Sequence, residues 1–188
     1  SSSLHVAESE GEGATWIFHV RVDGDTGASQ ILLRHGETAF KVVPYISPLK
    51  EVRCDIRLSD GSYVWYGSGL YITYGKFHTI AFVFDGTDFY AVLDGVKGNV
   101  VNIGQPLYSH SGDLRISRPP DYLWGVLSAM SIYDRALSDS ELETIRNNPQ
   151  SPTTNGLVLW LNFDEGSGTT AYDKSGNGNH GTIYNAVW

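Results

Sequence analysis

The pattern of hydrophobic positions is densest over 76–95, KFHTIAFVFDGTDFYAVLDG. The run 77–84 is apolar at nearly every position, 85–88 has turn residues, and 89–93 is a second apolar run that ends at Asp-Gly. Strands without polar alternation are usually covered on both faces. The pattern therefore predicts a hairpin at the centre of two packed sheets and not at an edge.

Runs elsewhere in the chain alternate between apolar and polar positions. Trp16, Phe18, Val20 and Val22 occupy every second position, which is typical of a half-buried strand. A turn over 59–62 joins 52–58 and 63–66 into another hairpin. Further strands are predicted over 30–35, 39–45, 99–103, 114–117, 124–133, 157–163 and 182–188. The chain is therefore predicted to be all-β, a two-sheet antiparallel β-sandwich.

One segment has the pattern of a helix. Ser138 and Glu141 form a capping box, in which the serine hydroxyl accepts from the backbone N–H three residues on and the glutamate reaches back to the N–H of Ser138. Pro149 would end a helix that begins there. One short helix is therefore predicted over 139–147, followed by a stretch of linker-like composition up to residue 155.

Composition and charge narrow the classes of protein that fit. The 188 residues are 41% hydrophobic and include 21 glycines, which suits one turn-rich domain with a sizeable core. A net charge of −8 without a Lys/Arg cluster argues against nucleic acid as a partner, and no apolar run is long enough for membrane insertion. Cys54, the only cysteine, is predicted to be a buried small hydrophobe. The Ser-Ser-Ser start without methionine predicts a piece of a longer protein.

Aromatic residues gather over 63–74, YVWYGSGLYITY, on glycine-flanked strands. They can belong to the core, or they can form a platform for sugar rings, because an aromatic face covers the apolar C–H face of a pyranose. Both alternatives stay open from the sequence. The residues predicted to bind ligand, chosen by their positions near loops, are Trp65, Tyr66, Tyr122 and Trp124.

Candidate catalytic groups are few. Glu8, Glu10 and Glu12 alternate as the carboxylates of a glycosidase strand could, but they lie in a glycine-containing loop without apolar neighbours, so a solvated loop is the better prediction. Cys54 has no evident partner for nucleophilic chemistry, and the six histidines lack metal-ligand spacing. The chain is therefore predicted not to be an enzyme.

Three segments carry motifs of a known family. TYGKFHTIAFVFDGTDFYAVLDG at 73–95 is a strand-turn-strand unit, and WGVLSAMSIYDRALSDSEL at 124–142 is a strand followed by a helix start. GLVLWLNFDEGSGTTAYDKSGNGNHGTIYNAVW at 156–188 contains FDEGSGTT and DKSGNGNHG. These segments resemble the central hairpin, the closing strand and helix, and the opening of laminin-G-like jelly rolls in the concanavalin A-like lectin/glucanase superfamily. The resemblance implies a jelly-roll fold.

The order of these segments is unusual, because the stretch that resembles the family's opening stands at the end of the chain. One explanation is that 156–188 folds back and completes the sandwich, so that 1–188 is a single jelly-roll domain. The alternative is a domain over 1–150 followed by 156–188 as the start of a next repeat. We favour the first, because the second leaves apolar surface unburied on both pieces.

The resemblance also implies a structural Ca²⁺, which several jelly rolls of the superfamily bind. Asp164, Asp173, Asn177 and Asn179 offer the hard oxygen ligands that calcium prefers, on glycine-rich loops. These loops can instead be Asx-turns that hydrogen-bond to themselves. Positions 128–129 are Ser-Ala where the family usually carries Asp-Glu, so one carboxylate that could complete the site is absent.

The superfamily's glucanases carry an E-x-D-x-E or E-x-D-x-x-E strand motif, which is absent here. The resemblance therefore implies a non-catalytic binding or adhesion module. Its expected partner is a glycan or a cell-surface protein, and its expected place is a larger extracellular, cell-surface or virion-surface protein with tandem repeats or a homo-oligomeric state. The alternatives are a structural spacer repeat and, less favoured, a glycoside hydrolase or lyase.

Overall fold

The computed structural model describes residues 13–35, 42–108, 113–117, 122–184 and 186–188. Its elements in chain order are β1 (Ala14–Val22), β2 (Gln30–Ile31), β3 (Arg34–His35), β4 (Val42–Ile46), β5 (Glu51–Arg57), β6 (Tyr63–Tyr71), β7 (Phe77–Phe84), β8 (Asp88–Leu93), β9 (Val96–Asn102), β10 (Leu114–Arg115), β11 (Gly125–Tyr133), α1 (Asp139–Asn147), β12 (Leu157–Leu161), β13 (Thr170–Ala171) and β14 (Gly181–Thr182).

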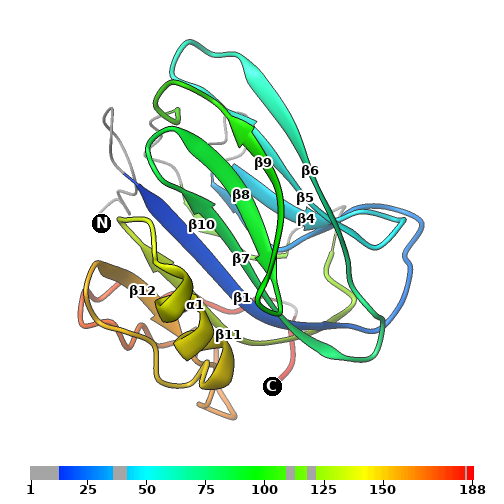
Figure 1. The fold of residues 1–188 in the computed structure, drawn as a ribbon. Helices are drawn as coiled ribbons and strands as arrows, with labels where there is room; N and C mark the ends of the chain where they lie inside the picture. The colour runs from blue at the N-terminus through cyan, green and yellow to red at the C-terminus, as the bar shows by residue number, and fades with distance from the viewer. Residues whose placement is uncertain (1–12, 36–41, 109–112, 118–121, 185) are drawn as a thin grey trace.

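Two antiparallel sheets pack against each other (Figure 1). The larger has six strands in the order β12-β11-β1-β7-β8-β9, and the smaller has four in the order β2-β4-β5-β6. Two short pairs, β10-β3 and β13-β14, lie outside these sheets. The predicted fold class, an all-β two-sheet antiparallel sandwich with one short helix, is confirmed.

The main core fills the space between the sheets. Phe18, Phe82 and Phe89 point into it from the six-stranded sheet, and Ile46 and Ile56 meet them from the four-stranded sheet; all five are essentially fully buried. Burying each such side chain stabilises the fold by about 1.5–3 kcal/mol. The hairpin of β7 and β8 is buried along nearly its whole length, as its sequence pattern predicts.

Helix α1 explains why that hairpin is covered on both faces. Leu142 and Ile145 pack with residues of β1, β7 and β8 in a second apolar cluster on the outer side of the six-stranded sheet. The capping box is present: Glu141 N donates to the Ser138 hydroxyl, and the Glu141 carboxylate accepts from Ser138 N at 2.9 Å. The predicted helix is therefore confirmed.

Within the described part of the chain no helix combines the length and the apolar composition needed to cross a bilayer.

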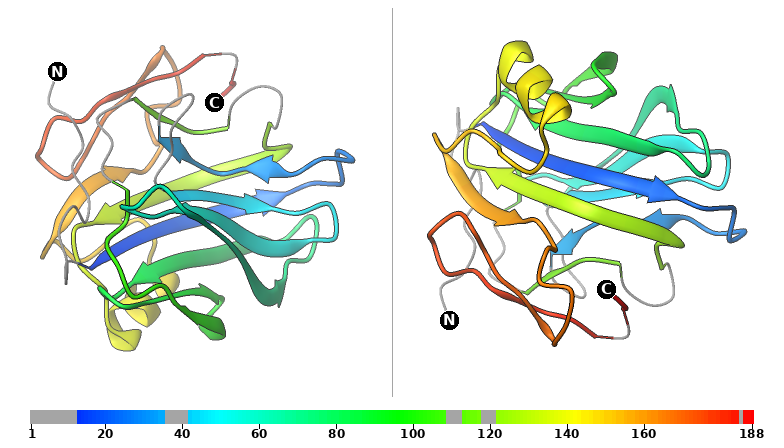
Figure 2. Two further views of the ribbon diagram at one scale, coloured as in Figure 1. Left: turned by 90° about the horizontal axis from the view of Figure 1, so that it is seen from above. Right: turned by 90° about the horizontal axis from the view of Figure 1, so that it is seen from below.

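The C-terminal segment contributes an edge strand to the larger sheet. Strand β12 pairs antiparallel with β11, with Leu159 opposite Ile132 and Leu161 opposite Met130. Both leucines are buried in the main core. Figure 2 shows β12 beside β11, with the rest of this segment continuing along the same side of the molecule. This chain therefore fills the edge beside β11 with its own C-terminal residues.

Several strand predictions need correction. The run 30–35 forms two short strands, β2 and β3, in different sheets. The predicted final strand over 182–188 is wrong, because among its described residues only Thr182 pairs, in the short strand β14, and Tyr184 and Val187 are exposed. Cys54 is buried and free, as predicted. The loop that carries Glu8, Glu10 and Glu12, and part of the predicted strand 39–45, lie outside the described residues.

Candidate functional site

The outer face of the four-stranded sheet combines polar and aromatic side chains. On β5, Val52, Cys54 and Ile56 enter the core, and the residues between them point to the other side of the sheet. The same alternation holds on β6, where Tyr66 is buried and its neighbours are not. We call this outer surface the polar-aromatic face; it is formed by Tyr45, Glu51, Arg53, Asp55, Arg57, Tyr63 and Trp65.

The aromatic part of this face is a pair of neighbouring rings. Trp65 is 71% exposed and Tyr63 is 40% exposed. Their ring centroids lie 6.5 Å apart with an interplanar angle of 17°, so the rings are nearly parallel. Two neighbouring exposed rings offer apolar aromatic surface against which a further ring can pack.

The acidic group beside these rings is Asp55, the cross-strand partner of Trp65. Burial raises the pKa of Asp55, and hydrogen bonding to Tyr45 together with the charge of Arg53 opposes part of that rise. Burial and the nearby Asp55 carboxylate raise the pKa of Tyr45 to about 12. Asp55 Oδ1 is buried and has no hydrogen-bond partner among the described residues, so it is an unsatisfied acceptor beside the rings.

The basic groups on this face are held by their neighbours. Arg53 Nε lies 3.6 Å from Glu51 Oε2. The Arg57 guanidinium lies 5.5 Å from the centroid of the Tyr63 ring and 4.1 Å from that of Tyr108. Within the described ranges, the Nε atoms of both arginines are buried without a hydrogen-bond partner. Buried polar atoms are normally satisfied. Unsatisfied buried atoms also occur on Thr153, Trp160, Asn162 and Glu165, so those of this face point to a ligand site because exposed aromatic rings stand beside them.

The structure corrects the prediction for Tyr66. This side chain is 3% exposed and lies edge-on against Phe89, with centroids 5.3 Å apart. Its hydroxyl donates to Asn99 O at 2.6 Å and accepts from Ala91 N at 2.9 Å. Burial raises its pKa to about 12. Tyr66 is therefore a core residue that joins β6 to β8 and β9, because it occupies the inward position next to Trp65, and a ligand on the outer face does not reach it.

Trp124 and Tyr122 are exposed, as predicted, but belong to the loop before β11. The Trp124 ring lies against Gly24, where an added Cβ would come within 2.9 Å of a ring carbon. Trp124 N donates to Gln30 Oε1 at 2.8 Å. In the described ranges no ring contact or hydrogen bond joins either residue to Trp65. Of the four residues predicted to bind ligand, the structure places only Trp65 on the polar-aromatic face.

The residues predicted to bind calcium are occupied by hydrogen bonds. Asp173 is 7% exposed, and its Oδ1 accepts from Trp160 N at 3.0 Å and from Ser175 N at 2.9 Å. Its Oδ2 accepts from Ser175 Oγ and from Asn179 N, both at 2.9 Å. Burial acts to raise the pKa of Asp173, but these donors outweigh it and leave the pKa below its ordinary value. A carboxylate with four donors has little capacity left for a cation.

The other three predicted calcium ligands also face protein groups. Asn177 Nδ2 donates to Leu157 O at 3.0 Å, and Asn179 Nδ2 donates to Val158 O at 3.1 Å, so both amides present N–H groups there. Asp164 pairs with Lys174 at 3.3 Å. No group of three or more His, Cys, Asp or Glu side chains in the described part of the chain could hold a metal.

This set does not fit a calcium ion and instead matches the alternative, self-bonded Asx-turns. The turn also covers the free edge of β12, because Lys174 N donates to Trp160 O at 2.8 Å and the two asparagines bond to carbonyls of the same strand. Covering an edge strand blocks pairing with other chains. The loop over 173–179 is therefore a structural cap.

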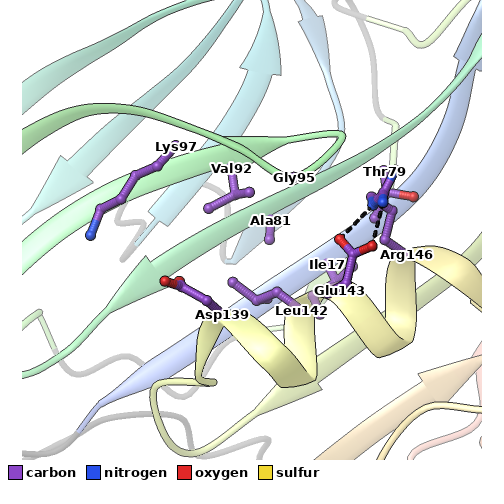
Figure 3. Close-up of a pocket in the computed structure, with 10 residues that line it drawn as sticks. All are labelled: Ile17, Thr79, Ala81, Val92, Gly95, Lys97, Asp139, Leu142, Glu143 and Arg146. Atoms are coloured by element: carbon purple, nitrogen blue, oxygen red, sulfur yellow. Dashed lines mark hydrogen bonds and ion pairs between the residues drawn. The ribbon is translucent and has the colours of Figure 1, made fainter.

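A small pocket of about 220 Å³ lies between α1 and the outer side of the six-stranded sheet (Figure 3). Three of its four charged residues already have partners: Glu143 and Arg146 are ion-paired, and Lys97 Nζ lies 3.6 Å from the centroid of the Tyr90 ring. Pockets for small ligands are usually larger, about 300–1,000 Å³. The polar-aromatic face is therefore the better candidate site.

Sequence reasoning missed the polar half of the candidate site. The signal was the alternation on β5, where charged residues stand between Val52, Cys54 and Ile56. That alternation predicts an outward charged row on 51–57, but it does not show that the row lies beside Trp65. The neighbourhood depends on the register of β5 with β6, which pairs Asp55 with Trp65 and Arg57 with Tyr63.

Comparisons with known proteins agree with this fold. A model of the family described as "Concanavalin A-like lectin/glucanases superfamily" matches residues 2–143. No curated protein matches the sequence. Among solved structures, a candidate carbohydrate binding protein from Bacteroides ovatus ATCC 8483 is similar with a TM-score of 0.72 and 14% identity over 97% of this chain. This chain spans 58% of the Bacteroides protein.

Two further structures are similar at lower scores. The CBM40 domain of the Ruminococcus gnavus IT-sialidase, solved with alpha2,3 sialyllactose, has a TM-score of 0.59 and 17% identity over 77% of this chain and 100% of the domain. The binding domain of botulinum neurotoxin serotype G has a TM-score of 0.59 and 12% identity over 80% of this chain and 40% of that chain. At these identities the likeness concerns the fold.

Proposed function

We propose that this chain, which belongs to the concanavalin A-like lectin/glucanase superfamily, is a non-catalytic carbohydrate-binding module that holds its ligand on the polar-aromatic face. One observation carries the proposal: the exposed Tyr63–Trp65 pair stands beside buried polar atoms of Asp55, Arg53 and Arg57 that lack hydrogen-bond partners within the described ranges. The rings can stack on the C–H face of a sugar, and the polar atoms can bond its hydroxyls.

The similar structures support the same class of ligand. The Bacteroides protein is described as a candidate carbohydrate binding protein, and the Ruminococcus domain was solved with a sialylated sugar. The neurotoxin domain is a binding domain as well. Since the likeness itself concerns the fold, the residues of the polar-aromatic face carry the assignment to carbohydrate.

The carboxylates on the polar-aromatic face support binding without catalysis. Glycosidases need two carboxyl groups about 5–9.5 Å apart. Asp55 and Glu51 stand four residues apart on β5, which separates them by about 13 Å along an extended strand. Glu51 is also engaged, because its Oε1 accepts from Gly69 N at 3.0 Å. This face therefore offers a surface for binding, and the hydrolase or lyase alternative finds no carboxylate pair on it.

We further propose that the module serves recognition or adhesion in a larger extracellular, cell-surface or virion-surface protein, as tandem repeats or as a homo-oligomer. Its partner would be a glycan, free or on a cell-surface protein. A structural spacer has no need of exposed aromatic residues. The exposed pair of Tyr63 and Trp65 therefore favours recognition over that alternative.

The proposed module spans 1–188, with 156–188 completing the sandwich. Leu159 and Leu161 in the core and the pairing of β12 with β11 support this assignment. We expect that deleting 156–188 abolishes cooperative thermal unfolding, because it removes several buried apolar side chains worth about 1.5–3 kcal/mol each and opens the β11 edge. Deleting only 186–188, which includes the exposed Val187, is the control and should leave the transition intact. A stable, monomeric 1–155 would instead support a domain over 1–150.

The proposed function is tested by a glycan array followed by calorimetry on the best ligand. Trp65→Ala should weaken binding by about tenfold or more, because exposed aromatic anchors carry much of the energy of such contacts. Trp124→Ala is the matched control, since Trp124 is also an exposed tryptophan but lies off the polar-aromatic face. An equal loss in both variants would overturn this choice of site. Failure of the wild-type chain to bind any glycan would overturn the proposed function.

A further inference from the structure

We infer that the polar-aromatic face selects glycans that carry an anionic group, a carboxylate or a sulfate, and that Arg57 binds this group. The inference rests on the proposed function and adds to it the chemical class of the ligand. It is carried by the position of Arg57, by the lack of an acidic partner for it in the described part of the chain, and by the balance of charge on this face.

Arg57 stands between two tyrosines that fix its guanidinium. Tyr63 is its cross-strand partner on β6, and Tyr108 N donates to Arg57 O at 2.9 Å from the neighbouring chain segment. Its guanidinium lies 4.1 Å from the centroid of the Tyr108 ring and 5.5 Å from that of Tyr63. Contact with ring faces leaves the in-plane N–H groups of a guanidinium free to donate, and it reduces the entropy lost when a ligand binds.

The other arginines show that an acidic partner would be the ordinary arrangement. Arg21, Arg53, Arg135 and Arg146 each have a carboxylate within 4 Å. Arg57 has none in the ranges that the structure describes, although acidic residues outnumber basic ones by 21 to 13 in the chain. Guanidinium binds carboxylate and sulfate oxygens through two parallel hydrogen bonds, so Arg57 has the geometry and the unused charge for such a group.

The charge balance of the polar-aromatic face differs from that of the whole chain. Arg53 and Arg57 carry two positive charges, and Glu51 and Asp55 are the two acidic residues of the face. The face is therefore close to neutral on a chain of net charge −8. A neutral face on an acidic molecule repels an anionic ligand less than the rest of the surface does.

The experiment compares acidic and neutral glycans of matched backbone. Polygalacturonate and its full methyl ester test the carboxylate, and heparin and desulfated heparin test the sulfate, within an array that also holds neutral galactan, xylan and laminarin. We expect the acidic member of at least one pair to bind about tenfold more tightly than its neutral or desulfated counterpart, with an affinity that falls as salt rises. The pair of glycans that shows the difference identifies the recognised anionic group as a carboxylate or a sulfate.

Variants then assign the effect to Arg57. Arg57→Gln should weaken binding of the acidic glycan by about tenfold or more and leave binding of its neutral counterpart unchanged. Arg57→Lys keeps the charge but loses the planar fork, so it should recover only part of the affinity, and it carries the test if the glutamine variant fails to fold. Arg146→Gln, on α1, is the matched control and should bind like the wild type.

The outcomes separate this inference from the proposed function. Preference for neutral glycans, or an unchanged affinity for acidic glycans in folded Arg57→Gln, overturns the role of Arg57 and leaves carbohydrate binding standing. An equal loss in Arg146→Gln overturns it as well, because the effect would then come from net charge alone. If the wild-type chain binds no glycan at all, both the inference and the proposed function are overturned.

Discussion

Asp55 on the polar-aromatic face is partly buried and Asp173 beside β12 is buried, and the hydrogen bonding around the two aspartates is opposite. Asp173 accepts four hydrogen bonds from protein donors, and these hold its pKa below the ordinary value in spite of burial. Asp55 has an oxygen without a partner in the described part of the chain, and burial raises its pKa. The first carboxylate is satisfied by the protein, and the second is not.

This difference teaches how to separate polar groups that serve the fold from those that can serve a ligand. The Asp- and Asn-rich loop over 173–179 has the composition of a cation site, but its side chains bond to its own backbone and to β12. The composition of the face around Asp55 points less clearly to a site, but three of its buried polar atoms, on Arg53, Asp55 and Arg57, have no hydrogen-bond partner among the described residues. Residue composition suggested the calcium site. The hydrogen bonds of the side chains then distinguish polar groups that serve the fold from those that can bind a ligand.

The largest effect that follows from this comparison concerns Asp173. Asp173→Asn should lower the free energy of unfolding by about 2–3 kcal/mol, because the amide of the new side chain replaces a charged acceptor and turns an N–H group toward existing donors. Chemical denaturation in urea at pH 7 measures this change. The effect should appear as a lower midpoint with an unchanged slope.

Asp55→Asn is the matched variant on the other side of the comparison. It should change the free energy of unfolding by less than about 1 kcal/mol, because Asp55 makes few protein hydrogen bonds and its ionised form is disfavoured by burial. If Asp55→Asn lowers the free energy of unfolding by as much as Asp173→Asn does, or by more, the contrast drawn between the two aspartates is wrong.

The sequence predicted most of the fold because the fold depends on local patterns. The apolar run over 77–84, the capping box at Ser138 and a strand that begins at 157, predicted to end at 163 and observed to end at 161, follow from local patterns. The site depends on register, which local patterns do not reveal. Tyr66 and Trp65 are adjacent and similar in kind, and a shift of one position decides which of them faces solvent.

A smaller effect, with opposite sign for the two aspartates, should appear on acidification. The pKa of Asp173 lies below its unfolded value of 3.8, so its stabilisation is present above pH 3.8 and is lost as pH falls through the folded pKa. The pKa of Asp55 lies above 3.8, so the folded state takes up its proton first and gains stability as pH falls toward 3.8.

Differences between wild type and variant isolate each group from the other carboxylates. The stability gap between wild type and Asp173→Asn should narrow below pH 3.8. As pH rises from about 4 to 7, the free energy of unfolding of Asp55→Asn should increase relative to that of the wild type, because Asp55 of the wild type then carries a charge that burial disfavours. Urea denaturation at a series of pH values measures both. A gap for Asp173→Asn that stays constant through the acid range would contradict the role given to its hydrogen bonds.

The smallest expected effect is that of calcium. EDTA and millimolar Ca²⁺ should both leave Tm unchanged, because Asp173 and the amide groups of Asn177 and Asn179 are occupied by protein partners. An ion bound to the folded state would raise stability by about 2.7 kcal/mol at a hundred times its dissociation constant, so the assay is sensitive. A rise in Tm that Asp173→Asn abolishes would show that the loop exchanges its hydrogen bonds for metal ligands. Asp173 would then be available to a ligand, as Asp55 is, and hydrogen-bond satisfaction in the free chain would no longer separate the two regions.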